Sequence, residues 1–561
     1  MSFNSFNGGL SGEVSLLQNL RELHLTANFL EGNIPTDIGN ITKLQILNLG
    51  GNKFSGVIPS SIPNLMELKI LDLGSNLLSM EIPTNIGSLS NLTTLTMSNN
   101  NLKGRIPSSI QNLAKLEILD LENNLLTGEI PSWLFNINDL QSLFLGENNL
   151  TWNNNANIVP TCMLFKLSLK SCGLIGEIPN WISKQKTLYY LDLSENQLEG
   201  MFPIWLADME VTILILSDNN LIGSLPPCLF NSRNSTTLSL ARNNFSGELP
   251  DNMGDATELQ ILMLARNNFS GKVPNSISNM SSLRLLDLSA NKFVGNTLPD
   301  LSSLSLNVID ISSNQFSGEL PTNFPSFTKF LALGRNNFSS SLPRNLINMS
   351  DLIYLDIHDN KITGELPEFI CQFSTLRVLI LRNNFLQSSI PECISNLSSL
   401  QILDLSSNHL VDEIPSKLGN LVGLIPESLA KLQQLTVLDV SNNKLTGKIP
   451  VGGQMDTMNN PNYYANNSGL CGMQIQVTCP KDLSPAKPTK IESKETWFSW
   501  EGVLIGYIAG FFVTVGSTYL IGHFTPAPPP NHYSRQRRQR VQILGLSQIG
   551  LRGYHLSNLE A

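Results

Sequence analysis

The chain has 561 residues, of which 41% are hydrophobic and 14% charged, and its formal net charge is −9 at pH 7. Residues 525–561 hold five Arg and one Glu, so this segment carries +4 and residues 1–524 carry −13. This acidic balance argues against a nucleic-acid surface, which needs clustered Lys and Arg. The apolar content argues against a disordered chain. Because 561 residues is long for one globular core, a repeat architecture is favoured.

The first residues already belong to a repeating pattern. In the opening MSFNSFNGGLSGEV, Asn4, Phe6 and Gly8 occupy the positions of an NxFxG motif. No basic stretch followed by an apolar run, the pattern of a signal peptide, occurs there. We therefore expect the sequence to be an N-terminally truncated version, or gene model, of a longer protein.

The pattern LxxLxLxxNxLxGxIP recurs through about residues 1–450. Clear copies are LQILNLGGNKFSGVIP (44–59), LEILDLENNLLTGEIP (116–131), LRVLILRNNFLQSSIP (376–391) and LQILDLSSNHLVDEIP (400–415). Nearly every step between the asparagines of this pattern is 24 residues. The column consists of Asn4, Asn28, Asn52, Asn76, Asn100, Asn124, Asn148, Cys172, Asn196, Asn219, Asn243, Asn267, Asn291, Asn314, Asn336, Asn360, Asn384, Asn408 and Asn443.

One unit of 24 residues cannot bury its own apolar face, so the units must stack. The alternating LxL residues predict a short strand that pairs with its neighbour in a parallel sheet. A buried Asn amide can bond backbone groups that the strands leave unpaired, and the Gly and Ile-Pro that follow bend the chain. The fold class is thus an α/β solenoid of about 18–19 repeats with a concave parallel sheet, roughly 90 Å along its arc. One repeat near 409–436 looks defective, because only 35 residues separate Asn408 from Asn443 and two repeats need 48.

The LxGxIP form resembles the plant-specific class of leucine-rich repeats. The run GGQMDTMNNPNYYANNSGLCG (452–472) resembles the end cap of the kinase-less plant receptor-like proteins, a family that includes Cf-type disease-resistance proteins. The resemblance implies a cell-surface receptor-like protein that binds an extracellular peptide, protein or glycan and signals through a receptor kinase with its own leucine-rich repeats. Defence and development are both compatible with it. Members often carry an island ahead of their last repeats, for which the even column leaves no room.

Residues 451–482 are expected to form the C-terminal cap, closed by a disulfide between Cys471 and Cys479 because a terminal repeat must cover its apolar face. The four residues Cys162, Cys228, Cys371 and Cys393 have no assignable partners, and Cys172 is the expected free thiol. Eleven N-x-[ST] sequons predict a glycosylated, extracellular repeat region. They are Asn40, Asn91, Asn149, Asn234, Asn244, Asn268, Asn279, Asn337, Asn348, Asn396 and Asn466.

The candidate ligand-binding residues are expected at exposed strand positions on the concave side. Acidic residues precede the Asn column first, and arginines precede it a few repeats later: Glu147, Glu195, Asp218, Arg242, Arg266 and Arg335, with Arg382 one position further back. An elongated ligand would meet acidic and then basic groups, and Arg can grip a carboxylate or sulfate through two hydrogen bonds. The alternative is a solvated charge pattern without a ligand.

No sequence motif for enzymatic chemistry is present. The chain has no P-loop, GxGxxG, HExxH or GxSxG motif and no protein-kinase signature. Asp356, His358 and Asp359 in DIHDN are better explained as solvated positions than as metal ligands. The sequence therefore predicts no enzyme, no cofactor and no metal site.

The C-terminal part predicts a membrane anchor. A stalk at 483–500 precedes a helix at 501–523, which contains twenty residues without a charge (502–521), and a tail at 524–561 begins with a cluster of Arg. The repeats would lie outside the plasma membrane and the tail in the cytoplasm. Gly502, Gly506 and Gly510 share one helix face, which would let the helix of a partner kinase approach closely.

Two other interpretations remain open at this point. The same repeats occur in extracellular inhibitors such as the plant polygalacturonase-inhibiting proteins, although those are soluble and about half as long. The chain could also be a non-functional fragment, which the missing start and the 35-residue step favour.

Overall fold

The computed structural model describes residues 2–153, 158–411, 429 and 431–479. They lie in one compact unit that spans Met1–Asp482. The predicted stalk (483–500), membrane helix (501–523) and tail (524–561) lie outside the described residues, as does most of the predicted defective repeat. In the described part of the chain, no helix is both long enough and apolar enough to cross a membrane.

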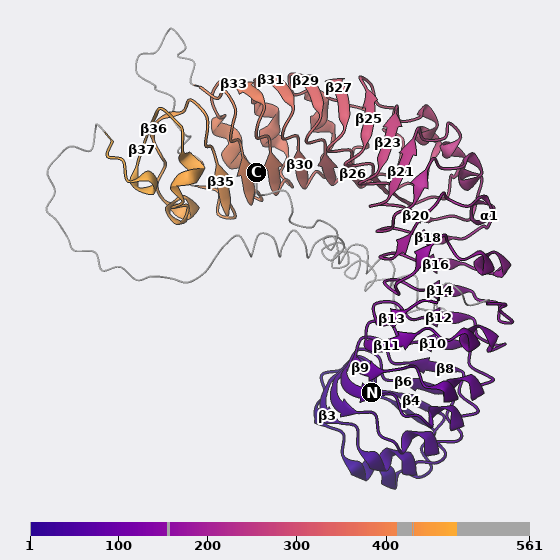
Figure 1. Ribbon diagram of the computed structural model, residues 1–561. Helices are drawn as coiled ribbons and strands as arrows, with labels where there is room; N and C mark the ends of the chain where they lie inside the picture. The colour runs from indigo at the N-terminus through magenta and orange to yellow at the C-terminus, as the bar shows by residue number, and fades with distance from the viewer. Residues whose placement is uncertain (1, 154–157, 412–428, 430, 480–561) are drawn as a thin grey trace, which may run out of the picture. The chain divides into compact units, whose positions relative to one another are not determined.

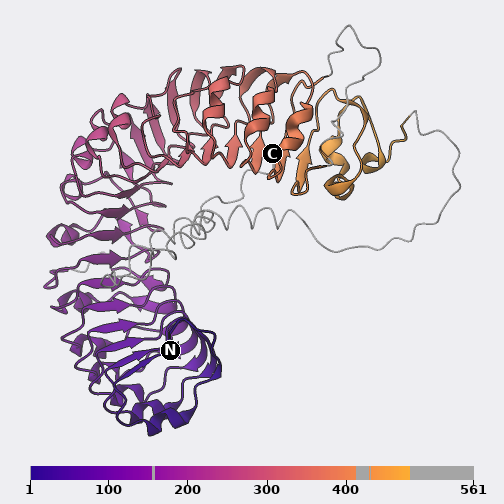
Figure 2. The same cartoon turned by 180° about the vertical axis from the view of Figure 1, so that it is seen from behind.

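A parallel sheet of three-residue strands runs along one side of the stack, here called the strand side (Figure 1). Within the described unit it forms the inner side of the curve, and the view from behind shows the same order (Figure 2). The strands are, in order of pairing, β2 (Glu22–His24), β4 (Ile46–Asn48), β6 (Ile70–Asp72), β8 (Thr94–Thr96), β10 (Ile118–Asp120), β12 (Ser142–Phe144), β14 (Lys166–Ser168), β16 (Tyr190–Asp192), β18 (Ile213–Ile215), β20 (Thr237–Ser239), β22 (Ile261–Met263), β24 (Leu285–Asp287), β26 (Val308–Asp310), β28 (Phe330–Ala332), β30 (Tyr354–Asp356), β32 (Val378–Ile380), β34 (Ile402–Asp404) and β35 (Val437–Asp439).

The register of this sheet aligns the middle residue of each strand with that of the next. Leu71 pairs with Leu95 and Leu95 with Leu119, and all three are fully buried. The flanking strand residues face away from this core. The two strands β34 and β35 pair directly, with Leu403 opposite Leu438, so they are neighbours despite the longer interval of chain between them.

Further parallel strands, two to five residues long, follow most positions of the Asn column and form lateral sheets. The first sheet contains β1 (Asn7–Gly9), β3 (Phe29–Asn33), β5 (Lys53–Val57), β7 (Leu77–Glu81), β9 (Asn101–Gly104), β11 (Leu125–Glu129) and β13 (Asn149–Thr151). A pair, β15 (Ile175–Gly176) and β17 (Gln197–Leu198), comes next. The third sheet contains β19 (Ile222–Gly223), β21 (Asn244–Gly247), β23 (Asn268–Gly271), β25 (Lys292–Gly295), β27 (Gln315–Glu319), β29 (Asn337–Ser340), β31 (Lys361–Glu365) and β33 (Phe385–Gln387), and the cap contributes β36 (Thr446–Lys448) and β37 (Gly469–Cys471).

The outer side of the stack consists of 3-10 helices, where the expected α/β class implied α-helices. Among the described residues, α1 (Ile204–Ala207) is the one α-helix. The repeat is short, and the Pro that ends the extended segment (Pro107, φ −61°, ψ 131°) leaves room for only about one turn. The 3-10 helices are η1 (Gly12–Leu16), η2 (Thr36–Asn40), η3 (Ile62–Asn64), η4 (Ile86–Ser88), η5 (Ser108–Asn112), η6 (Ser132–Asn136), η7 (Asn180–Lys184), η8 (Pro227–Phe230), η9 (Met253–Asp255), η10 (Asn275–Asn279), η11 (Arg344–Asn348), η12 (Glu368–Gln372), η13 (Glu392–Asn396), η15 (Gly453–Thr457), η16 (Pro461–Tyr464) and η17 (Met473–Ile475).

Aromatic rings continue the core beyond the leucines. Phe245, Phe269, Phe293, Phe316 and Phe338 are buried in consecutive repeats, and neighbouring rings stack with centroids 6.1–6.3 Å apart. Each ring stacks on the ring of the next repeat, from Phe245 to Phe338. This nearest-neighbour packing supplies apolar burial that no single repeat could provide.

The buried asparagines form a ladder of the kind that the sequence predicts. The amide of Asn76 donates to the carbonyl oxygens of Leu73, Gly74 and, one repeat earlier, Leu49, at 3.1–3.2 Å, and its oxygen accepts from the Phe54 amide at 2.9 Å. One side chain thus pairs four backbone groups at the turn that leaves the strand.

The ladder extends one step beyond the last predicted position. Asn467 donates to Val440, Tyr464 and Ala465 and accepts from Leu445, all at 3.0–3.3 Å. It lies 24 residues after Asn443, and buried Tyr464 takes the place of a repeat leucine. The cap therefore begins with one more turn of the same ladder.

Candidate functional site

The predicted ligand-binding residues lie at the edge of the strand side and not on the strands themselves. Six of them directly precede a ladder position and have left-handed backbone, for example Glu147 (φ 54°) and Arg335 (φ 53°). This conformation ends the strand, so the expectation of strand positions was wrong. Arg382 lies two residues after β32, and Asn383 (φ 50°) takes the left-handed position in its repeat. We call these left-handed positions the turn row.

The acidic half of the turn row is built around one lysine. Lys170 forms ion pairs with Glu147 in the preceding repeat and with Glu195 in the next one, the second at 3.2 Å. Burial alone would lower the pKa of Lys170. The hydrogen bond and charge of Glu147, together with the charge of Glu195, outweigh burial and raise that pKa above its ordinary value. Part of the acidic charge that a ligand was expected to meet is therefore balanced within the protein.

The acidic and basic halves meet at Asp218 and Arg242. The Arg242 guanidinium donates two hydrogen bonds to the Asp218 carboxylate, one of them 2.6 Å long between Nη2 and Oδ2. The hydrogen bond that Arg242 donates to Asp218 is the largest cause of its raised pKa. Arg242 is about one-third exposed, so a carboxylate could share this guanidinium only by competing with Asp218.

The C-terminal part of the row is a second charged network. Arg335 pairs with Asp359 at 3.3 Å, and Asn383 donates to the same carboxylate at 2.8 Å. Burial would raise the Asp359 pKa. The Asn383 hydrogen bond, the charges of His358 and Arg382 and the Arg335 hydrogen bond together lower it instead. Arg266 occupies the same turn position (φ 53°) between the two networks.

The His358 ring, in DIHDN, lies between two carboxylates of its own repeat. Its Nδ1 is 2.6 Å from Asp356 and its Nε2 is 3.8 Å from Asp359. Tyr354 lies two residues before Asp356 on the same strand and donates a hydrogen bond to it at 3.2 Å. The Tyr354 ring stacks on that of Phe330, with centroids 4.1 Å apart. These contacts give the polar groups a structural role on the strand side.

Two half-buried acids on the strand side escaped the sequence interpretation. The Ser98 hydroxyl donates to Asp120 at 2.7 Å, and the Ser168 hydroxyl donates to Glu122 at 2.8 Å. Burial and the charges of Asp120, Asp192 and Glu147 raise the pKa of Glu122 to about 7, although the Ser168 hydrogen bond lowers it. The LDLEN sequence carries two acids on one face of a strand, which is the signal that could have revealed them.

Two disulfides occur among the described residues. Cys471 joins Cys479 in the cap, with Cα atoms 5.1 Å apart, and Cys371 joins Cys393, with Cα atoms 5.7 Å apart. The second bond links η12 to η13 in the next repeat. A spacing of 22 residues, close to one repeat, was the available signal. The described free thiols are Cys162, Cys172 and Cys228, and burial raises the pKa of Cys162 to about 11.

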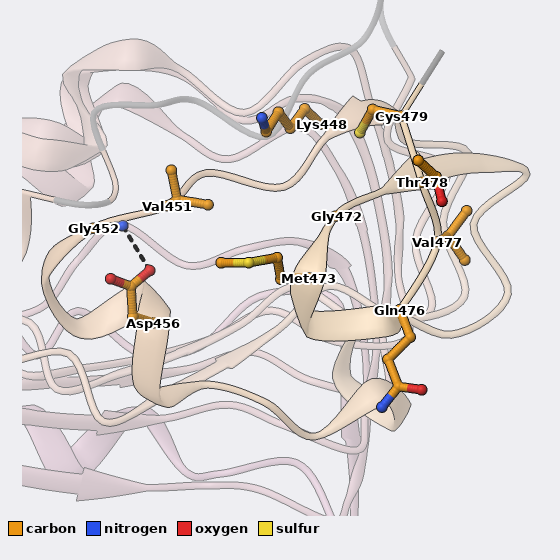
Figure 3. A pocket seen from close by; sticks show the side chains of 10 residues that line it. All are labelled: Lys448, Val451, Gly452, Asp456, Gly472, Met473, Gln476, Val477, Thr478 and Cys479. Carbon is orange, nitrogen blue, oxygen red and sulfur yellow. Dashed lines mark hydrogen bonds between the residues drawn. The ribbon is translucent and has the colours of Figure 1, made fainter. Parts of the chain in front are cut away.

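Two surface hollows lie outside the strand side. One, of about 730 Å³, is in the cap, where Met473, Val451 and Val477 surround a space beside the Gly452 amide, which donates to Asp456 at 2.7 Å (Figure 3). The other, of about 830 Å³, lies beside the stacked rings of Trp152 and Trp181. Cys479 of the cap disulfide lines the first hollow, and neither hollow is lined by a predicted ligand-binding residue.

All eleven sequon asparagines lie off the central sheet. Asn149, Asn244, Asn268 and Asn337 each begin a lateral strand, and Asn40, Asn279, Asn348 and Asn396 each end a 3-10 helix. Asn466 (φ 57°) precedes the ladder residue Asn467 and therefore lies on the turn row, beyond the predicted ligand-binding residues. The predicted membrane-helix glycines Gly502, Gly506 and Gly510 lie outside the described residues.

Models of repeat families match most of the described unit. "Leucine-rich repeat region" matches residues 4–201, and "Leucine rich repeat" models match 233–293 and 305–327. "Zer-1-like, Leucine-rich repeats" matches 343–480. These matches agree with the ladder and the central sheet.

Several plant receptors have a similar sequence or structure. Receptor-like protein 46 of Arabidopsis thaliana is 48% identical over 67 residues, 11% of this chain and only 8% of that relative. The Arabidopsis receptor kinase HAESA, solved with the peptide hormone IDA and the co-receptor SERK1, has a TM-score of 0.64 and 32% identity over 85% of this chain and 83% of its own. The plant peptide hormone receptor RGFR1, solved with RGF2, has a TM-score of 0.61 and 30% identity over 84% and 85%.

Proposed function

We propose that this chain, which belongs to the plant leucine-rich repeat proteins, is a receptor-like protein whose strand side binds an elongated extracellular ligand in defence or development. Signalling is then supplied by a partner receptor kinase in the plasma membrane. The solved relatives HAESA and RGFR1 hold peptide hormones, and HAESA also holds a co-receptor, which supports both parts of the proposal.

The observation that carries the proposal is the order of charges along the turn row. Acids occupy it on either side of Lys170, and arginines occupy three of its five positions from Arg242 to Arg335. These residues lie along one edge of a long sheet, and no sequon lies on the strands of that sheet. A ligand with a cationic and an anionic end would therefore have one preferred direction on the strand side.

The arginines are already paired, which shapes how a ligand would bind. Asp218 and Asp359 hold Arg242 and Arg335 in place, so their guanidinium groups are oriented before a ligand arrives. A ligand carboxylate or sulfate would take remaining N–H donors or displace the aspartate. Salt should weaken such contacts, because the groups are partly exposed.

Joint replacement of Arg242, Arg266 and Arg335 by Ala tests the ligand site. We expect the ligand response to fall at least tenfold while surface expression is unchanged. The matched control replaces Lys292, Arg344 and Lys361 by Ala, which removes the same charge from exposed positions off the strand side. An intact response in the first variant, with normal surface expression, would refute the turn-row site.

The partner kinase is assigned to the membrane helix. Gly502, Gly506 and Gly510 recur every four residues, which places them on one face of a helix that a second helix can approach. Changing all three to Leu should abolish co-purification with the kinase and leave membrane insertion unchanged. A control with Ala at the same positions keeps the face small and should retain co-purification. Retained co-purification in the Leu variant would refute the assignment.

A further inference from the structure

A second line of charges, which we call the start row, lies at the opposite end of the strands from the turn row. It consists of the residues directly before β24, β26, β28, β30 and β32, which are Arg284, Asn307, Lys329, Ile353 and Arg377. Their backbones are stacked, since each amide donates to the carbonyl of the preceding member at 2.8–2.9 Å. Every second member is therefore a cation, in five consecutive repeats.

The cations of the start row differ from those of the turn row in having no internal partner. Arg284 and Arg377 are exposed and Lys329 is half-buried. Within the described part of the chain, none of the three makes a side-chain hydrogen bond or ion pair. Arg242 and Arg335, by contrast, are each bound to an aspartate. The start-row cations are thus available to an external anion without breaking an existing bond.

The spacing of these cations selects a ligand conformation. Neighbouring strands are about 4.8 Å apart, so cations two strands apart recur every 9.6 Å or so. A polyproline II chain rises about 3.1 Å per residue and presents the same face every third residue, or roughly every 9.3 Å. Side chains on one face of an extended β-strand recur about every 6.8 Å, so after a first contact they no longer match the spacing of the cations.

The residues between the cations suit such a chain. A polyproline II helix has no internal hydrogen bonds, so its backbone groups stay open to a side chain such as the Asn307 amide. Ile353, between Lys329 and Arg377, offers an apolar contact to a proline ring. One side of the ligand thus meets charge, amide, charge, apolar group and charge in order.

We propose that the start row from Arg284 to Arg377 binds a proline-rich peptide in polyproline II conformation with an acidic side chain at every third residue. This inference rests on the proposed function, because it names a ligand class for the same strand side. It adds a contact line that the turn row does not provide. The three cations act together, and the regular stacking of the repeats sets their distance.

The test uses two synthetic peptides and the full-length chain. One peptide is Glu-Pro-Pro-Glu-Pro-Pro-Glu, and the other has the same composition with its three Glu consecutive. We expect the first to bind at least tenfold more tightly than the second. The triple variant with Glu at Arg284, Lys329 and Arg377 should lose this preference, and the control with Glu at Lys292, Arg344 and Lys361 should keep it.

Several results would overturn the proposal. They are equal binding of the two peptides, an equal loss in both triple variants, or absence of binding by the wild-type chain. Displacement of the spaced peptide by polygalacturonate at equal charge concentration would identify an acidic polysaccharide as the better ligand and also overturn it. Both variants are first checked for surface expression. The peptide test can fail while the variant of Arg242, Arg266 and Arg335 still loses its ligand response. In that case the start-row proposal is wrong and the proposed function stands.

Discussion

The Glu122 carboxylate accepts a hydrogen bond from the Ser168 hydroxyl at 2.8 Å, although the two residues are 46 positions apart. Glu122 follows β10, and Ser168 is the last residue of β14. Because β12 pairs with both of these strands, the bond connects the first and third of three consecutive repeats. It passes Gly146, where an added Cβ would lie 2.6 Å from Oε1 of Glu122. The hydrogen bond between Glu122 and Ser168 thus passes over the Cα atom of Gly146 on the strand side, where there is no room for a side chain.

The pH dependence of stability should fall when Glu122 is replaced by Gln. The folded chain raises the Glu122 pKa from 4.5 to about 7, mainly by burial. Between these values the folded state binds more protons than the unfolded one, so Glu122 makes stability decrease as pH rises. The resulting decrease in the free energy of unfolding is up to about 3 kcal/mol. Glu122→Gln should remove this pH dependence, because the amide still accepts a hydrogen bond but does not ionise.

Urea unfolding at pH 5 and pH 8 measures this difference. The wild-type midpoint should be lower at pH 8, and Glu122→Gln should narrow the gap between the two pH values. Glu117→Gln, at an exposed position of the same repeat, is the control and should leave the gap as it is. The same gap in wild type and Glu122→Gln would contradict the assignment.

Replacing Gly146 by Ala should break the bridge for steric reasons. The new Cβ would lie 2.6 Å from Glu122 Oε1, 3.0 Å from Lys170 Cβ and 3.1 Å from the Lys170 carbonyl oxygen. We expect a loss of about 1–3 kcal/mol, the usual range for overpacking. Gly74→Ala is the matched control, because Gly74 has the same repeat position and its nearest contact would be 3.2 Å away. A smaller effect at Gly146 than at Gly74 would argue against the bridge.

Removing one ladder amide should cost more than a typical surface change. Asn291 donates to Leu264, Leu288 and Ser289 and accepts from the Phe269 amide, so Asn291→Ala leaves four backbone groups without this partner. The free energy of unfolding should fall by about 2–4 kcal/mol. Each unpaired buried polar group costs about 1–3 kcal/mol, and water can replace the lost partner of some of them. The urea midpoint of the variant measures it, and a change below about 0.5 kcal/mol would contradict the ladder as a source of stability.

The one cysteine in the ladder offers the reverse experiment. Cys172 Sγ is 3.6 Å from the Leu145 carbonyl oxygen and 3.4 Å from that of Lys170, which are weak contacts for a thiol. Cys172→Asn should restore stronger bonds to the same oxygens and raise the urea midpoint. A lower midpoint would show that the surrounding repeat has adapted to sulfur.

The sequence was informative wherever a residue has one role in every repeat. The leucines and asparagines meet the same neighbours in each unit, so periodicity alone predicts the strand, the ladder and the buried face. The sequence prediction placed the turn-row residues on the strands, because the repeat pattern does not reveal that Glu147 and Arg335 have left-handed backbone. That conformation becomes visible only when the next residue turns inward to pair backbone groups.

Contacts that depend on side-chain length were beyond sequence reasoning. Nothing in the pattern shows that Glu122 reaches past Gly146 to Ser168, or that Arg242 is already bound to Asp218. The start row was missed for another reason. Its cations are separated by about two repeats of 24 residues, and their relation appears only once the strands are stacked side by side.

The disulfide between Cys371 and Cys393 gives the last prediction. It joins η12 to η13 and closes a loop of 22 residues in sequence separation. The loop-entropy relation gives a stabilisation of about 3 kcal/mol for this length. Replacing both cysteines by Ser should therefore lower the urea midpoint, and a reducing agent should lower the wild-type midpoint while changing the double variant less. Cys228→Ser removes a free thiol from η8 and is the control. Peptide mapping without reduction should recover Cys371 linked to Cys393, and recovery of either residue as a free thiol would contradict the pairing.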